Sequence, residues 1–135
     1  MDGLILTPLK EIYNPKGNIL HVMKKNDDGY NNFGEAYFSF INKGEIKSWR
    51  KHSIMTLNLV VPIGIIKFVI FDESKNKFFS IELSQNNYQR LTLKSGLWIA
   101  FQGLSDLNII LNISDIKHDP KESISKQLHE IKYEW

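Results

Sequence analysis

The residues that could do chemistry in this chain lie mostly between positions 35 and 52, with one more candidate nearer the C-terminus. They are cations, carboxylates, imidazoles and a phenol: Glu35, Tyr37, Lys47, Arg50, His52 and His118. Arginine and lysine bind phosphate and carboxylate groups, and histidine moves protons near neutral pH. The set therefore indicates anion binding combined with acid–base chemistry.

The densest group lies in the segment 44–52, Gly-Glu-Ile-Lys-Ser-Trp-Arg-Lys-His. Side chains alternate along a strand, which gives two faces here: Lys47, Trp49 and Lys51 on one, and Ser48, Arg50 and His52 on the other. Arg50 and His52 could then face an anionic ligand together. The alternative is a solvated edge strand whose lysines discourage aggregation.

The strand predicted at residues 35–41 has the same ambiguity. Ala36, Phe38 and Phe40 share one face, and Glu35, Tyr37 and Ser39 share the other. In an open-mouthed barrel the polar face can look inward and form a binding site. In a plain sandwich the same residues face water.

Several common kinds of site lack their sequence signatures. The four histidines, at positions 21, 52, 118 and 129, show no spacing that would place two on one face, and there is no cysteine. No glycine-rich phosphate loop and no Gly-x-Ser-x-Gly motif occurs. We therefore expect no catalytic metal.

The composition is that of one ordinary globular domain spanning residues 1–135. Hydrophobic residues make up 42% of the chain, charged residues 24%, and the net charge is +2, which is too small to imply a nucleic-acid partner. No apolar run is long enough to cross a membrane, and the first residues lack the pattern of a secretory signal. Together with the absence of cysteine, these features predict a cytoplasmic protein.

Short runs rich in Ile, Val, Phe and Tyr recur between turn residues, as expected for strands. They cover residues 19–23, 35–41, 54–61, 65–71, 78–83, 89–93, 97–101 and 109–113. Their number and spacing predict an antiparallel sandwich or barrel. One C-terminal helix is also predicted, with Asp119 as its cap, Glu122 near its free amides, and Ile124, Leu128 and Ile131 as its apolar stripe.

The order of motifs resembles the dTDP-4-dehydrorhamnose 3,5-epimerase family. The resemblance is carried by Pro15-Lys16-Gly17, by Gly34-Glu35-Ala36-Tyr37-Phe38-Ser39 and by Gly44-Glu45-Ile46-Lys47-Ser48-Trp49. It continues through Gly64 and Asp72, Leu83-Ser84 with Asn87, and the stretch from Gly96 to Phe101 before Leu104-Ser105. It covers the chain from about residue 14 to Trp135.

The resemblance implies a cupin-like jelly-roll barrel, usually a homodimer, that works without metal or redox cofactor on a nucleotide-linked keto sugar. In the family a histidine and a tyrosine move the proton while basic residues hold the diphosphate. In this chain the catalytic candidates are His52, His118 and Tyr37. The substrate-binding candidates are Lys16, Glu35, Ser39, Lys47, Arg50, Trp98 and Asn112.

The chain also departs from the family pattern at the catalytic positions. The family's catalytic histidine falls on Arg50, its second histidine on Ile99, and its acid tyrosine on or near His118. An arginine stays protonated and cannot abstract a proton from carbon. His52 or His118 would therefore have to act as the base.

Three functions follow as hypotheses. The first is a metal-independent epimerase or isomerase of a nucleotide-linked 4-keto-deoxy sugar, used in surface-polysaccharide synthesis. The second is a related protein that binds the nucleotide sugar or carbohydrate but has lost catalysis. The third is a sugar-nucleotide 3,4-ketoisomerase, whose usual Arg-Gly-x-His-Ala-His pattern is missing here.

Overall fold

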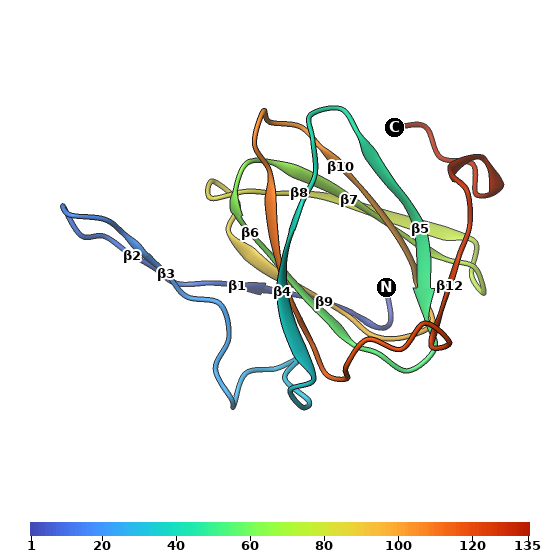
Figure 1. Ribbon diagram of the computed structural model, residues 1–135, viewed down its shortest axis with the longest axis horizontal. Helices are drawn as coiled ribbons and strands as arrows, with labels where there is room; N and C mark the ends of the chain where they lie inside the picture. The colour runs from blue at the N-terminus through green and yellow to red at the C-terminus, as the bar shows by residue number, and fades with distance from the viewer.

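The protein is built from two five-stranded antiparallel sheets that face each other (Figure 1). The computed structural model describes all residues, 1–135. One sheet has the strand order β1-β9-β6-β11-β4 and the other β12-β5-β10-β7-β8, with β2 and β3 forming a separate pair. The strands are β1 (Leu4–Pro8), β2 (Glu11–Ile12), β3 (Ile19–Leu20), β4 (Glu35–Phe40), β5 (Ile46–His52), β6 (Leu57–Ile63), β7 (Ile66–Asp72), β8 (Lys77–Leu83), β9 (Gln89–Leu93), β10 (Trp98–Gly103), β11 (Ile109–Ser114) and β12 (Ser123–Ser125).

The main core fills the space between the two sheets. Its members alternate along their strands, as the period of two requires: Leu57, Leu59 and Val61 on β6, Ile66, Phe68 and Ile70 on β7, and Leu91 and Leu93 on β9. Because β4 and β12 are the outermost strands of their sheets, the two sheets can separate along the side where β4 and the β5–β12 pair lie. That separation leaves room for a site.

The all-β prediction is confirmed, and the strands at 35–41, 65–71, 78–83, 89–93, 97–101 and 109–113 form close to their predicted bounds. The residues 9–20 form a two-stranded arm, β2 and β3, that extends away from the sandwich (Figure 1). No helix in the structure has the length and apolar character needed to span a bilayer.

The predicted C-terminal helix is wrong. Residues 123–125 form the edge strand β12, and only a single turn of 3-10 helix, η1 (Leu128–Glu130), follows. Ile124, expected on a buried stripe, is 56% exposed. The segment pairs with β5 instead, with Ser123 opposite His52 and Ser125 opposite Arg50, so backbone hydrogen bonds to a distant strand replace those of a helix.

A second cluster lies on the outer face of the β5-β10-β7 sheet. It contains Trp49, Val69, Trp98, Ala100 and Ile131. The last residues of the chain pack over it, and the C-terminus lies beside β5 (Figure 1). The strand β5 is therefore enclosed between the interior of the sandwich and this outer cluster.

Candidate functional site

A cavity of about 450 Å³ opens between the two sheets on the side of β4 and β5. It is lined from one sheet by residues of β4, β6 and β11, and from the other by residues of β5 and β10 and the end of β12. The lining residues are Tyr37, Ser39, Lys47, Ser48, Trp49, Arg50, His52, Leu57, Leu59, Ile99, Phe101, Ile110, Asn112, Ser125 and Lys126. Every charged group among them is a cation or the imidazole of His52, so the cavity suits an anionic ligand.

His52 stands on the cavity wall with a carboxylate behind it. Its Nδ1 lies 2.6 Å from Oε1 of Glu122. The carboxylate is 3% exposed and also accepts the backbone N–H groups of Ile54 and Met55, at 3.0 and 2.9 Å. Burial by itself would raise the pKa of Glu122, but the hydrogen bonds from His52, Met55 and Ile54 outweigh burial and hold the pKa below its ordinary value.

This arrangement determines which nitrogen of His52 is free. An ionised carboxylate is only an acceptor, so Nδ1 carries the proton and donates a hydrogen bond to Glu122. The lone pair of a neutral imidazole is then on Nε2, which has no protein partner. A histidine oriented in this way by a buried carboxylate is suited to act as a general base.

A β-bulge in β5 brings three basic side chains to the same wall. Arg50 pairs with Ile99 and Lys47 pairs with Phe101 on β10, so two residues of β5 lie opposite the single residue Ala100. The extra residue reverses the alternation at this point. Lys47 therefore joins Arg50 and His52 on the cavity side, and the prediction that Lys47 shares a face with Trp49 and Lys51 is wrong.

The two nearest cations differ in what they already bind. The Lys47 ammonium donates to Ser39 Oγ at 2.9 Å and to the carbonyl of Phe40 at 2.8 Å, and it lies 5.9 Å from the centre of the Phe101 ring. It links the two sheets. Arg50 is exposed to the cavity mouth and has no hydrogen bond or ion pair within the protein, so its guanidinium is available to a ligand.

Tyr37 and Asn112 form the opposite wall. They are cross-strand partners on β4 and β11, and Asn112 donates from Nδ2 to the Tyr37 hydroxyl at 2.9 Å. Because the hydroxyl accepts this bond, its own hydrogen is free to be donated elsewhere. The polar face of β4 thus looks into the cavity, while Phe38 and Phe40 point outward.

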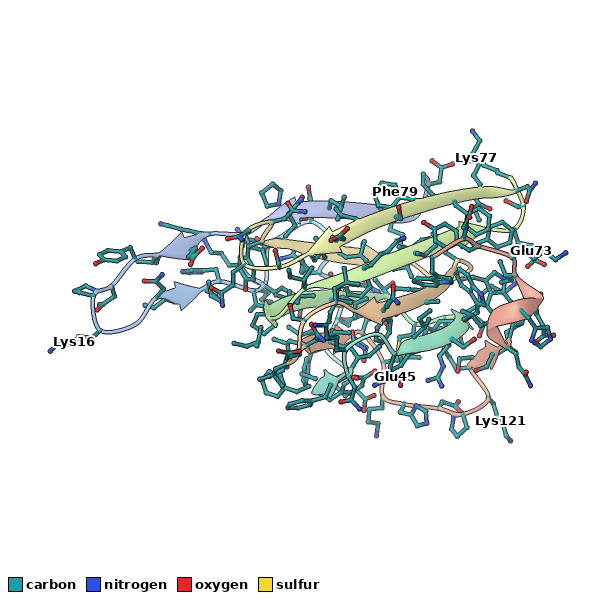
Figure 2. The ribbon with its side chains drawn as sticks, turned by 90° about the horizontal axis from the view of Figure 1, so that it is seen from above. Lys16, Glu45, Glu73, Lys77, Phe79 and Lys121 are labelled. Carbon is teal, nitrogen blue, oxygen red and sulfur yellow. The ribbon has the colours of Figure 1, made fainter.

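The structure does not bring four of the predicted residues to this cavity. Lys16 lies at the tip of the β2–β3 arm (Figure 2), Glu35 lies at the start of β4, and His118 is exposed in the connection between β11 and β12. Trp98 points to the outer face because it alternates with the inward-facing Ile99, and its Nε1 donates to Glu73 at 3.0 Å.

Sequence reasoning assigned no site role to Glu122, Ser48, Ser125 or Lys126. The position of Glu122 three residues after Asp119 predicts a carboxylate in the first turn of a helix, whereas the structure places it beside His52. No group of three or more His, Cys, Asp and Glu side chains is placed to hold a metal ion.

Replacing Glu122 with glutamine should remove a pH-dependent part of the stability. The folded-state pKa of Glu122 is lower than its ordinary value of 4.5, so the charged carboxylate stabilises the fold above that pH, and this contribution is lost as pH falls through the folded-state pKa. Urea titrations of wild type and Glu122→Gln between about pH 3 and pH 7 should show a difference in unfolding free energy that shrinks on the acid side. A difference that does not vary with pH would contradict this role.

Several solved structures with the same architecture are sugar isomerases or epimerases. A dTDP sugar isomerase from Desulfovibrio desulfuricans G20 is 28% identical, with a TM-score of 0.90 over 94% of this chain and 85% of that chain. A dTDP-6-deoxy-D-glucose-3,5-epimerase from Legionella pneumophila Philadelphia 1, bound to dTDP-4-keto-L-rhamnose, is 18% identical, with a TM-score of 0.81 over 93% and 73% of the two chains. A sugar 3,4-ketoisomerase from Thermoanaerobacterium thermosaccharolyticum, bound to TDP, is 16% identical, with a TM-score of 0.80 over 92% and 88%.

No protein-family model and no curated protein sequence matches the chain. The structural comparisons nevertheless confirm the cupin-like fold that the sequence predicted. They also confirm the resemblance on which that prediction depended, because the structural neighbours are dTDP-sugar isomerases and 4-keto-6-deoxy-sugar epimerases.

Proposed function

We propose that this protein is an epimerase or isomerase of a nucleotide-linked 4-keto-deoxy sugar that works without a metal. The observation that carries the proposal is the His52–Glu122 pair, with the free Nε2 of His52 in a cavity whose other charged groups are cations. The chemistry needs a base for a carbon-bound proton and cations for a diphosphate. The candidate base, His52, and the cations Lys47 and Arg50 all belong to β5.

In this mechanism each side chain has one task. Arg50 binds the diphosphate with its unpaired guanidinium. His52 Nε2 takes a proton from a carbon next to the 4-keto group, and Glu122 stabilises the imidazolium that results. The electrons of the broken C–H bond form an enolate, and a proton returned to the same carbon from the other side gives the epimer.

Tyr37 is our proposal for the group on the other side. It belongs to the opposite sheet from His52 and has a hydroxyl hydrogen free to donate. A base and an acid on opposite walls suit epimerisation, in which the proton leaves one face of the sugar and returns to the other. Nothing is consumed, because the proton lost from carbon is replaced by one from the tyrosine and solvent.

A 3,4-ketoisomerase is the second candidate, and one observation favours it. His52 is the only imidazole on the cavity wall, and moving a proton between C3 and C4 on one face needs a single base. The nature of the product separates the two reactions, since epimerisation keeps the ketone at C4 and ketoisomerisation moves it to C3. A binding protein without catalysis would leave the substrate unchanged.

The test begins with binding and ends with the product. Thermal-shift measurements with dTDP, UDP and GDP identify the nucleotide, and the absence of any shift would exclude nucleotide recognition. Incubation with dTDP-4-keto-6-deoxyglucose, followed by proton NMR, should then show inversion at C3 or C5. Unchanged substrate in the presence of tight dTDP binding would overturn the catalytic proposal.

We also propose that the protein is a homodimer. Phe38 and Phe40 are 66% and 57% exposed on the outer face of the edge strand β4, and exposed apolar side chains grouped in this way are typical of association surfaces. Light scattering on wild type and on Phe38→Lys tests this, because a charged side chain in the interface should give the monomer mass.

The cellular setting is a proposal of the same kind. We infer a cytoplasmic enzyme that supplies deoxy sugars for surface polysaccharides, since the synthesis of such polysaccharides would use an isomerised nucleotide sugar. Cell fractionation and the sugar composition of the polysaccharide in a deletion strain test these two statements separately.

A further inference from the structure

The C-terminal strap, residues 122–135, runs directly behind the strand that carries the site. Its strand β12 pairs with β5 at Arg50, Lys51 and His52, and the N–H of Lys126 donates to the carbonyl of Trp49 at 2.9 Å. Figure 1 shows this segment following β5 and ending beside it. The strap thus contacts the same short stretch of β5 that supplies the basic side chains of the cavity.

Both residues of the β5 bulge are hydrogen-bonded to the strap through their side chains. Ser48 Oγ donates to the carbonyl of Lys126 at 2.6 Å, and Trp49 Nε1 donates to the carbonyl of Leu128 at 3.4 Å. The bulge is the feature that turns Lys47 to the cavity side together with Arg50. Its geometry therefore depends on bonds to the strap as well as on pairing with β10.

The side chain of Lys126 makes a further set of contacts that hold the strap. Its ammonium lies 3.8 Å from Glu73 and 4.8 Å from the centre of the Trp98 ring. Glu73 also accepts the Trp98 Nε1–H and a bond from Lys51, at 3.0 and 3.3 Å. Lys126 also lines the cavity, whereas Glu73, Trp98 and Lys51 do not. These contacts tie the strap to β10, to β5 and to the turn after β7.

The end of the chain closes over Trp49 from the outside. The aromatic clamp, Trp49 with Phe78, Tyr133 and Trp135, has ring-centre distances of 6.2 Å for Trp49–Trp135, 6.4 Å for Trp49–Phe78 and 5.3 Å for both Tyr133–Phe78 and Tyr133–Trp135. Lys67 lies 5.0 Å from the centre of the Tyr133 ring and 5.7 Å from that of Trp135. Trp49 is fully buried as a result.

We propose that the C-terminal strap is a positioning element of the site, in which the aromatic clamp holds Trp49 and the β5 bulge and thereby sets Arg50 toward the ligand. Trp135 and Tyr133 are positioning residues, because neither lines the cavity. The statement that Arg50 meets a diphosphate rests on the proposed function. The mechanical part, that the clamp sets the orientation of Arg50 and the bulge, does not.

Trp135→Ala tests the proposal in the chain of residues 1–135. We expect the dissociation constant for dTDP, measured by calorimetry, to rise by about 3- to 10-fold, the effect of losing one aromatic contact. Trp135→Phe, which keeps a ring, should restore most of the affinity. Ile124→Ala is the matched control, because it removes an apolar side chain of the strap that is 56% exposed and outside both the clamp and the cavity.

A second readout needs no nucleotide. In labelled protein, Trp135→Ala should shift the NMR signals of the Arg50 Nε–H and the Trp49 Nε1–H and speed hydrogen exchange at the Lys126 amide. Tyr133→Leu, which keeps apolar volume, should change these signals in the same way. It provides a second test of the clamp in case Trp135→Ala does not fold.

The outcomes separate the two proposals. If Trp135→Ala leaves the Arg50 and Trp49 signals in place, the positioning role is overturned whatever the protein binds. If those signals move but the dTDP affinity changes by less than about twofold, the mechanical part is supported, and the statement that the clamp sets Arg50 toward the ligand is overturned. If wild type binds no dTDP, the proposed function fails, and the NMR signals alone decide the role of the strap.

Discussion

Replacing His52 with asparagine should lower the turnover of a 4-keto sugar nucleotide by a factor of about 10² to 10⁴, the usual contribution of a general base. Asparagine keeps a polar side chain that can still bond to Glu122, but it has no basic nitrogen to present to the cavity. Because His52 is not expected to hold the diphosphate, the affinity for dTDP should stay close to that of wild type. Turnover followed by NMR and dTDP binding by calorimetry measure the two quantities independently.

His118→Asn is the matched control for that experiment. His118 is exposed between β11 and β12 and does not line the cavity, so its replacement should leave turnover unchanged. If His118→Asn abolished turnover while His52→Asn did not, the base would have been assigned to the wrong histidine.

Replacing Arg50 with alanine should have its main effect on binding. Hydrogen bonds to charged groups lose about 10- to 100-fold in affinity when the donor is removed, and Arg50 is the cavity cation that has no partner in the protein. Lys47 cannot fully compensate, because its ammonium already donates to Ser39 and Phe40. Calorimetry with dTDP should therefore show a much weaker dissociation constant, and Arg50→Lys should recover part of the loss.

The control for Arg50 is an exposed cation elsewhere on the surface. Lys121 lies in the exposed turn before β12 (Figure 2), and Lys121→Ala removes the same charge without touching the cavity. Equal losses of affinity in Arg50→Ala and Lys121→Ala would mean that the protein attracts the nucleotide through overall charge. In that case Arg50 would not be the binding residue.

Most of the strands could be predicted from the sequence because their signal is local. In β4, the alternation of Tyr37 and Ser39 with Phe38 and Phe40 showed both faces correctly, and only the direction of the polar face stayed open. Which face looks inward depends on what the opposite sheet presents. That information is not contained in the strand itself.

The bulge in β5 could not be predicted for a similar reason. A strict period of two separates Lys47 from Arg50, whereas the structure unites them because residues 48 and 49 both lie opposite Ala100. A bulge is a property of the pairing between two strands and of the groups that bond to it. The relevant partners, Lys126 and Leu128, lie more than 70 residues further along the chain.

The C-terminal segment shows how a local signal can mislead. Ile124, Leu128 and Ile131 have helical spacing, and Glu122 follows Asp119 as a first-turn carboxylate would. Yet the Glu122 carboxylate is bonded to His52, Ile54 and Met55, and these long-range bonds hold the segment extended along β5. The carboxylate expected near the free amides of a helix instead orients the candidate base.

The central claim is that His52 removes a proton from a carbon next to the ketone of a nucleotide-linked sugar. Incubating wild type and His52→Asn with dTDP-4-keto-6-deoxyglucose in deuterated water tests it directly. Wild type should introduce deuterium at the carbon that it deprotonates, and His52→Asn should introduce almost none over the same time. Tight dTDP binding by wild type with no deuterium in the sugar, or equal labelling by both proteins, would contradict the claim.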